Sequence, residues 1–481
     1  MAFLNLQGIS LAFIGVQIFD EVNLTIERGE KVGLVGRNAS GKTTLLRLIE
    51  GSVKPDSGVV SFQKGIRTAY LSQEVPNDLP GTVFDVVASG SREYVDLSAR
   101  NPSPSARLLH EGTPPLREEL DRIHDNLDTE GVWYKREQVN KSLSQLGLDT
   151  DRDFRSLSAG LKRQVLLTKA LVSEPDILLL DEPSNHMDID SIKELEQMMA
   201  QFAGAIIFVT HDRMFLQKIA TRIIEIDRGR LFDQTCDYET FLVRRDANRD
   251  AEETKNALFD RKLKQEEHWV REGIKARRTR NEGRVRELVK MREMRSSRRD
   301  RPKNVKMEVQ EAERSGTLVA KADNIGFNYG DTQVISQFSA TILKGDRIGI
   351  LGPNGSGKTT LLRLLLGMLV PANGTIRLGS NLQISYSDQL LEQLDESKTA
   401  IENIGDGSDT VTVNGKSRHI FGYLQDFLFS PDQARSLVSG FSGGERKRLM
   451  LARLFTQPSN LLVLDEPTND LDIETLDLLE E

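Results

Sequence analysis

The sequence contains a single cysteine, Cys236, so no internal disulfide can form. One isolated thiol gives no indication of an oxidising compartment. The first residues, MAFLNLQGIS, lack the basic stretch and apolar core of a secretory signal. Long apolar runs are also absent, because the longest, LLRLLLGMLV at 361–370, is interrupted by Arg363 and falls well short of the roughly 20 residues that span a bilayer. These absences predict a cytoplasmic protein without a membrane partner.

Charge is distributed unevenly along the chain. The 481 residues are 28% charged with a net charge of −8, and this length allows two or three domains. Residues 261–303 contain 17 Lys or Arg against 7 Asp or Glu, a balance of +10, so the remaining residues carry −8 − 10 = −18. Charge separated in this way indicates that one segment meets a polyanion.

An internal repeat is the clearest large-scale feature. GRNASGKTTLLRLI begins at residue 36, and GPNGSGKTTLLRLL begins at residue 352, an offset of 352 − 36 = 316. Two further pairs keep this spacing: Phe13 with Tyr329, and Gln73 with Gln389. The chain therefore holds two copies of one domain.

Later motifs repeat at a shorter spacing. Ser158 pairs with Ser442 and Asp181 with Asp465, both at an offset of 284, so the first copy has 316 − 284 = 32 additional residues. We expect them within a turn-rich insertion at about 80–149. The predicted domains are 1–241 with this insertion, a basic linker at 242–315, and a second copy at 316–481.

The second copy is expected to be incomplete. In the first copy His211 follows Asp181 by 30 residues, and 465 + 30 = 495 lies beyond residue 481. The sequence thus stops before the counterpart of this histidine, and we expect a fragment of a longer protein.

Each copy has the pattern of an α/β domain. Short β-rich runs such as VNLTI are followed by Gly-rich turns and helical patterns. KVGLVG and RIGILG read as buried strands before those turns. ILLLDEP and LLVLDEP are apolar runs that end on acids, at the strand end where open α/β sheets bind ligands.

Both copies contain G-x-x-x-x-G-K-[ST], the pattern of a phosphate-binding loop. Its glycines allow backbone N–H groups to surround phosphates, its lysine reaches the β- and γ-oxygens, and its hydroxyl binds Mg²⁺. We therefore predict ATP and Mg²⁺ as ligands of two loops. The first loop comprises Gly36, Arg37, Asn38, Ala39, Ser40, Gly41, Lys42 and Thr43; the second comprises Gly352, Pro353, Asn354, Gly355, Ser356, Gly357, Lys358 and Thr359.

The acids after the apolar runs predict hydrolysis. Asp181 and Asp465 are placed to hold the Mg²⁺ shell, and Glu182 and Glu466 are placed to polarise an attacking water. A helix N-cap is the alternative for such a pair, but Asp-Glu-Pro in both copies favours the catalytic interpretation.

The order of motifs resembles an ATP-binding cassette (ABC) domain: phosphate loop, Gln73, LSAGLKRQ, LLLDEPSNHMD and VTHD, with Gln389, FSGGERKR and LLVLDEPTNDLD in the second copy. In that family two cassettes pair head to tail. The resemblance implies that the first loop faces Ser442, Gly443 and Gly444, and that the second faces Ser158 and Gly160. It also implies that Gln73 and Gln389 sense Mg²⁺ and water, and that His211 steadies the transition state. Phe13 and Tyr329 occupy positions where the family stacks an aromatic ring on adenine, but core packing explains each equally well.

Three departures from the family pattern predict unequal sites. The stretches LSAGLKRQ and FSGGERKR correspond to the signature motif of the family. Ala159 replaces the first glycine of this motif, Phe441 replaces Leu before the second signature, and Met187 replaces Leu after Asp-Glu-Pro. The Ala159 methyl would crowd nucleotide bound to the second loop.

Twin cassettes without membrane spans resemble the ABC-F class of ATPases, whose cassettes flank a helical hairpin inserted into the ribosome. EEHWVREGIKARRTRNEGRVREL at 266–288 resembles the Uup subgroup of that class. The resemblance implies two tandem α/β P-loop ABC ATPase domains joined by a long basic α-helical hairpin, in a monomer whose own cassettes pair.

The linker pattern predicts helices at 242–271 and 283–308, with Gly273 and Gly283 flanking a bend. Thirty helical residues extend about 45 Å. Basic residues would gather at the tip, and Arg forks suit phosphate. They are Arg271, Lys275, Arg277, Arg278, Arg280, Arg284 and Arg286.

The combined reading is an ATPase whose nucleotide-driven closure positions the linker on the ribosome, at rRNA and tRNA. Two alternatives remain: an ATPase that acts on branched DNA, and an energising subunit of a membrane transporter, which leaves the basic linker without a role.

Overall fold

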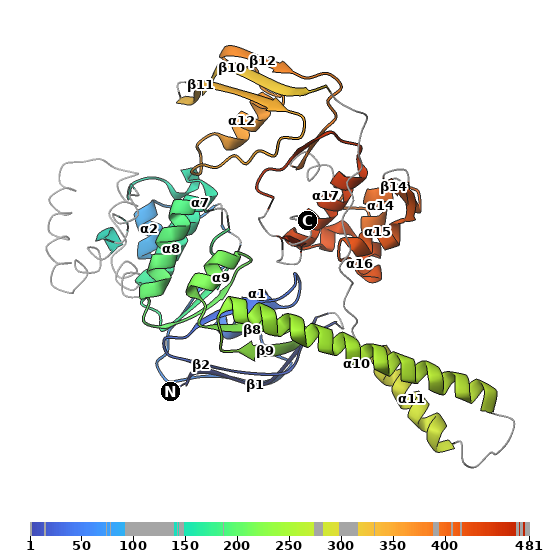
Figure 1. Cartoon of the computed structure of the whole chain (residues 1–481). Coiled ribbons are helices and arrows are strands. Elements are labelled where there is room, and N and C mark those ends of the chain that lie inside the picture. The colour runs from blue at the N-terminus through green and yellow to red at the C-terminus, as the bar shows by residue number, and fades with distance from the viewer. Residues whose placement is uncertain are drawn as a thin grey trace, which may run out of the picture.

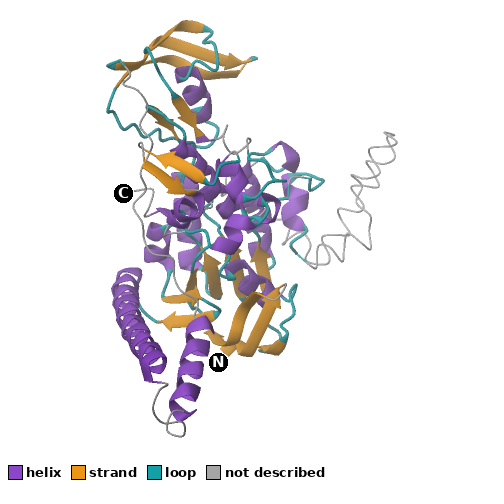
Figure 2. Cartoon of the chain, turned by 90° about the vertical axis from the view of Figure 1, so that its right-hand side faces the viewer, coloured by secondary structure: helices purple, strands orange, loops and turns teal. Residues whose placement is uncertain are grey.

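The computed structural model describes residues 2–476 except 14–15, 74, 77, 92–138, 142, 144–148, 186, 274–281, 298–315, 331, 388–393, 406, 414–415, 468–470 and 472–474. Figures 1 and 2 show the two cassettes and the long pair of helices that follows the first cassette in the chain. None of the helices in these described ranges is long and apolar enough to cross a membrane.

The first cassette begins with an antiparallel sheet of β1 (Ala2–Phe13), β2 (Val16–Glu27) and β4 (Ser57–Phe62), in the order β2-β1-β4. Apolar side chains of β1, among them Leu4, Leu6 and Ile9, are fully buried. Alternation between buried and exposed positions places one face of this sheet on the core.

A second, mostly parallel sheet forms the centre of this cassette, in the order β5-β6-β7-β3-β8-β9. Its strands are β3 (Lys31–Val35), β5 (Thr68–Leu71), β6 (Ile177–Asp181), β7 (Ala205–Val209), β8 (Arg222–Asp227) and β9 (Arg230–Gln234). Strands β6 and β7 are buried along their whole length, as expected of parallel strands covered on both faces. Because β3, β6 and β7 are parallel neighbours, the segments after them meet at one edge.

Helices cover this sheet and lead away from its binding edge. They are α1 (Lys42–Glu50), α2 (Val83–Ala88), α7 (Ala159–Val172), α8 (Ile189–Gln201) and α9 (Arg213–Ile219). The short turn η2 (Phe154–Ser156) precedes α7. Within the predicted insertion, Val139 and Leu143 pack with Val83, Val86 and Phe154, while 92–138 lies outside the described residues.

The second cassette repeats the antiparallel sheet as β10 (Leu318–Tyr329), β11 (Thr332–Leu343) and β12 (Asn373–Leu378), in the order β11-β10-β12. Helix α12 (Lys358–Leu365) packs against it. Strands β13 (Ile384–Tyr386) and β16 (Leu461–Val463) form a parallel pair. The chain between β13 and β16 forms a mostly helical part (Figure 1). Its elements are α14 (Ala400–Gly405), β14 (Thr410–Val413), β15 (Lys416–His419), α15 (Ile420–Asp426), α16 (Pro431–Arg435), η3 (Val438–Gly440) and α17 (Gly443–Thr456).

The run RIGIL at 347–351 is not the buried strand that the sequence predicts. It forms no strand, and Ile348 and Leu351 are 56% and 84% exposed. Its counterpart β3 is held between β7 and β8. Among the described residues of the second cassette, RIGIL pairs with no strand.

The linker forms two antiparallel helices, α10 (Tyr238–Gly273) and α11 (Glu282–Ser297). Leu263, Leu288 and Met291 pack between them, and Arg292 Nε lies 2.8 Å from Glu267 Oε1. The predicted bend agrees with these ends, whereas α11 is described only to Ser297, and the predicted continuation to 308 lies outside the described residues.

Helix α10 begins earlier than the predicted boundary at 241/242. Tyr238 and Phe241 are buried in the core of the first cassette, and Arg228 pairs with Glu252 at 2.7 Å. The first turns of α10 therefore belong to the cassette, because their apolar side chains complete its core, and the pair extends from that anchor (Figure 1).

Candidate active site

The first phosphate loop connects β3 to α1 in a conformation that depends on glycine. Gly41 has φ 104°, and a Cβ there would come within 2.7 Å of Ile18 Cγ2. The Lys42 ammonium donates to the carbonyl oxygens of Gly36 and Arg37 at 2.6 and 3.1 Å. The lysine is thus held inside the loop that its own backbone forms. In the second copy Lys358 donates to Gly352 and Pro353 at 2.9 and 3.0 Å.

The loops differ at one left-handed position. Ala39 adopts φ 62°, where the second loop has Gly355 with φ 77°. A Cβ at such a φ is strained. The first loop therefore holds an alanine in a strained conformation, whereas glycine avoids this strain in the second loop.

Asp181 and Glu182 lie at the carboxyl end of β6, and His211 follows β7. The Glu182 N–H donates to the Val209 carbonyl at 3.0 Å, and His211 Nε2 lies 3.2 Å from Glu182 Oε1. Glu182 has φ 50° and Glu466 has φ 46°. This matched left-handed backbone in both copies is the kind of local strain that marks functional positions.

Burial sets the electrostatics of these acids. It raises the pKa of Glu182 to about 7, opposed mainly by the charge of Lys42. Burial also raises the pKa of Asp181, opposed by a hydrogen bond from Thr43 and by Lys42. A carboxyl group that titrates near neutrality is suited to accept a proton from water.

The first loop and the second signature meet in one cavity of about 340 Å³. Gln73, Glu182 and His211 contribute from the first cassette. Ser442 caps α17 in a capping box with Glu445, so the signature presents a helix N-terminus, a favourable setting for an anion. The full lining is Ile18, Asn38, Ala39, Gly41, Lys42, Thr43, Thr44, Gln73, Asp181, Glu182, Val209, His211, Ser442, Gly443 and Gly444. The cavity joins segments 400 residues apart (442 − 42 = 400).

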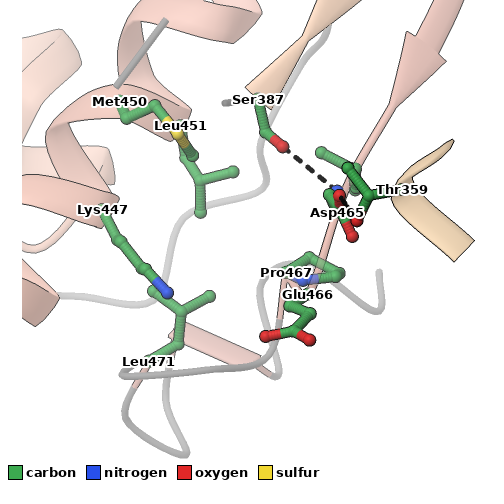
Figure 3. A pocket seen from close by; sticks show the side chains of 10 residues that line it. Thr359, Ser387, Lys447, Met450, Leu451, Asp465, Glu466, Pro467 and Leu471 are labelled. Carbon is green, nitrogen blue, oxygen red and sulfur yellow. Dashed lines mark hydrogen bonds between the residues drawn. The ribbon is translucent and has the colours of Figure 1, made fainter. Parts of the chain in front are cut away.

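The second loop has a different environment. Thr359 Oγ1 donates to Asp465 Oδ2 at 2.7 Å, and Ser387 Oγ accepts from the Asp465 N–H at 3.1 Å; Figure 3 shows both contacts. Lys447 lies across the cavity from them, and Glu466 also lines it. All lining residues come from the second cassette: Thr359, Ser387, Lys447, Met450, Leu451, Leu464, Asp465, Glu466, Pro467 and Leu471.

The structure does not bring Ser158 and Gly160 into this second cavity. Ser158 caps α7 with its hydroxyl and is exposed. The first cassette reaches the second loop elsewhere, because Asp188 Oδ2 accepts from the Asn354 N–H at 3.1 Å. Gln389 lies outside the described residues.

The two candidate adenine-stacking residues are surface side chains. Phe13 is 46% exposed and Tyr329 is 52% exposed. This exposure removes core packing as the explanation for either ring. Tyr329 meets Phe327 edge to face, with ring centroids 5.0 Å apart.

Sequence reasoning missed three residues at these sites. Tyr70 Oη donates to Asp181 Oδ2 at 3.3 Å, and Tyr386 Oη to Asp465 Oδ2 at 3.4 Å. Their spacing, 386 − 70 = 316, is the offset of the phosphate loops and could have revealed them. The third is Arg163, a buried arginine on α7 that bonds the carbonyls of Gln73, Asp181 and Glu182. Nothing in its sequence position indicated this contact.

The residues present fit a magnesium nucleotide. Hydroxyl and carboxylate oxygens, the ligands that Mg²⁺ prefers, already touch at Thr359 and Asp465. The Gly41 position leaves no room for a side chain, as a backbone that approaches phosphate closely requires.

The structure describes one of the seven basic side chains expected at the hairpin tip. Lys275, Arg277, Arg278 and Arg280 lie outside the described residues, and the side chains of Arg271 and Arg284 are likewise not described. Arg286 is described, on the exposed surface of α11. The tip arginines therefore stay a prediction.

Comparison with known proteins agrees with this geometry. A family model described as "ABC transporter" matches residues 19–185 and 335–469, and a second model with that description matches 224–307. "ATP-binding protein Uup" of Escherichia coli (strain K12) is 45% identical over 481 residues, which is 100% of this chain and 76% of the relative. The Haemophilus influenzae protein of that name is 44% identical over 100% of this chain and 74% of its own length.

"Energy-dependent translational throttle protein EttA" of Mycobacterium tuberculosis is 35% identical over 470 residues, covering 96% of this chain and 83% of the relative. Among solved structures, "Structure of ATP binding subunit of ABC transporter" shares 21% identity and covers 48% of this chain and 90% of that one. Its TM-score is 0.36.

These matches confirm the predicted fold class of tandem α/β cassettes and the predicted ATP hydrolysis. The chain belongs to the ATP-binding cassette family and is an ABC-F ATPase of the Uup type.

Proposed function

We propose that this ATPase uses closure of its two cassettes on nucleotide to position the α10–α11 hairpin on the ribosome, in contact with rRNA and tRNA, and that hydrolysis releases it. The observation that carries the proposal is the cavity in which Lys42 and Thr43 of one cassette face Ser442 and Gly444 of the other. A ligand held by both walls stabilises the closed arrangement by its differential affinity for it.

The residues of this cavity divide the chemistry of hydrolysis. Lys42 and the signature N-terminus would hold the γ-phosphate, Thr43 and Asp181 would hold Mg²⁺, and Gln73 would orient water. Bound Mg²⁺ would neutralise charge that develops on the phosphoryl oxygens. Glu182 accepts a proton from water at its buried carboxylate, and His211, 3.2 Å away, fixes that carboxylate and stabilises the transferring group.

The second site contributes differently. Thr359, Asp465 and Glu466 are assembled, but the signature of the first cassette does not line this cavity, and it has Ala159 and Leu161 where the other signature has Gly443 and Glu445. We assign the faster hydrolysis to the first site and a mainly binding role to the second.

The hairpin is coupled to the first site through α9. This helix starts two residues after His211, and Gln217 donates to Glu239 of α10 at 2.8 Å. Phe241 is 1% exposed in the same cassette core. A shift of the His211 segment is therefore transmitted to a helix that extends to the basic tip.

Two further observations favour the ribosome as the partner, in the cytoplasm. The balance of +10 at 261–303 suits a polyanion. The Mycobacterium tuberculosis relative is named for a role in translation. Branched DNA offers the same phosphate charge and is the partner to be excluded.

The test compares nucleotide states in one binding assay. The chain carrying Glu182→Gln and Glu466→Gln should sediment with ribosomes when ATP is present and stay in the supernatant without nucleotide. An excess of branched DNA should displace little of it, whereas an excess of ribosomes should clear the DNA complex. Retention that is equal with and without ATP, or preferential retention on branched DNA, would overturn the ribosomal assignment.

A further inference from the structure

Arg163 is among the largest fully buried side chains of the described residues, at 1% exposure. It lies in the first turns of α7, the helix that Ser158 caps. One terminal nitrogen donates to the Asp181 carbonyl at 2.6 Å and to the Glu182 carbonyl, and the other donates to the Gln73 carbonyl at 3.1 Å. A single guanidinium thus ties together three segments of the first cassette.

Two of these contacts fall at a strained stretch of backbone. Glu182 has a left-handed φ of 50°, a conformation that a non-glycine residue keeps only when its surroundings enforce it. Arg163 holds the carbonyl of that residue and of the one before it. A planar fork with fixed donor directions suits this task, since it fixes both carbonyls relative to Gln73.

The second cassette has a lysine where the first has Arg163. The counterpart of Arg163 is Lys447 (163 + 284 = 447), which lines the second cavity. An ammonium is a point charge on a flexible stem and cannot hold carbonyls in a planar geometry. The arginine at this helix position therefore belongs to the cassette whose catalytic glutamate lies in the site to which we assign faster hydrolysis.

We propose that Arg163 is a positioning residue that holds Glu182 and Gln73 in the geometry for hydrolysis and ties that geometry to the signature helix α7. The inference rests on the proposed catalytic role of Glu182. It also links α7, whose N-terminus carries the signature of the first cassette, to the turn of the catalytic glutamate in the same cassette.

The test uses the whole 481-residue chain with Arg163→Lys and Arg163→Met. Loss of the positioning contact should lower kcat about tenfold in R163K and about 100-fold in R163M. KM and the Kd for a fluorescent ATP analogue should change less than about twofold, because Arg163 does not line the cavity. Lys162→Met is the matched control, since Lys162 is the buried neighbour on α7 and lies over the Phe154 ring at 5.7 Å. K162M should cost thermal stability and leave kcat near wild type.

A double variant separates positioning from general damage. If Arg163 acts through Glu182, R163M/E182Q should turn over no more slowly than E182Q alone, because effects of residues that act as a unit do not add. A double variant slower than E182Q by the full R163M factor, or R163M losses in kcat and nucleotide affinity together, would overturn the proposal. R163K covers the case in which R163M fails to fold. E182Q that retains wild-type kcat would instead reject the catalytic role of Glu182 itself.

Discussion

The Asp188 carboxylate of the first cassette accepts a hydrogen bond from the Asn354 N–H in the second phosphate loop, with an N···O distance of 3.1 Å. Its other oxygen accepts from the Ser191 N–H at 2.9 Å and caps α8. These bonds, those from Ser191 first, lower the pKa of Asp188 below its ordinary value. One side chain therefore joins a helix start in one cassette to the nucleotide loop of the other.

Asp188→Asn should break the contact between cassettes and keep the cap. Asn has one acceptor oxygen where Asp has two, and the two residues are equivalent as N-caps. We expect an unchanged melting temperature and a Hill coefficient for ATP binding that falls toward one. Asp188→Ala should lose both the contact between cassettes and the helix cap, and loss of the cap should cost about 1 kcal/mol of stability. Wild-type cooperativity in both variants would show that this bond does not couple the loops.

Glu182→Gln should reduce kcat by roughly 10²- to 10⁴-fold with nucleotide affinity retained, because it removes the proton acceptor and keeps the shape of the side chain. The raised pKa of Glu182, about 7, adds a pH signature. The active form is the carboxylate, so kcat should decline as pH falls through about 7. The residual activity of the variant should not decline over this pH range. A decline that persists in E182Q would mean that another group causes it.

Ser442→Ala should impair the first site through its hydroxyl. Loss of a hydrogen bond to a charged oxygen costs about 1.5–3 kcal/mol, or roughly 10- to 100-fold in turnover. Ser430→Ala is the control, because Ser430 forms the same capping box on α16 and does not line the cavity. Both variants should lose about 1 kcal/mol of stability, and only S442A should lose activity. Equal activity in the two variants would argue against a role for this hydroxyl in the first site.

Neutralising Arg277, Arg278 and Arg280 together should weaken nucleic-acid binding and flatten its dependence on salt. Each lost phosphate contact reduces the slope of log K against log salt by about 0.7 to 0.9. The control removes three exposed positive charges from the first cassette, Arg28, Lys54 and Lys64. An unchanged slope in the hairpin variant, or an equal decrease in the control, would place the contact elsewhere.

Phe241→Ala should destabilise the first cassette by about 3–5 kcal/mol, the cost of truncating a fully buried ring. Phe259→Ala changes a half-buried ring between α10 and α11 and should leave the cassette transition in place. The difference in stability is measured in urea by the hydrogen-exchange protection of the backbone amides in β6 and β7. Equal protection of these strands in both variants would show that α10 is not part of the cassette core.

Local pattern determined much of this protein. The two phosphate loops, the acids after β6 and β16, and the hairpin bend all follow from short-range constraints: glycine where φ is positive, apolar runs that must be buried, and caps that begin helices. The offset of 316 residues also relates Tyr70 to Tyr386.

Tertiary structure decided what no local pattern encodes. The RIGIL run has the apolar content of a strand but pairs with no strand in the described part of the chain, and a strand's stability comes from such pairing. Arg163 reads as a surface charge until three carbonyls converge on it. Likewise, only the folded chain brings Lys42 to Ser442 and Asp188 to Asn354, since contacts between distant segments depend on the packing of whole domains rather than on sequence spacing.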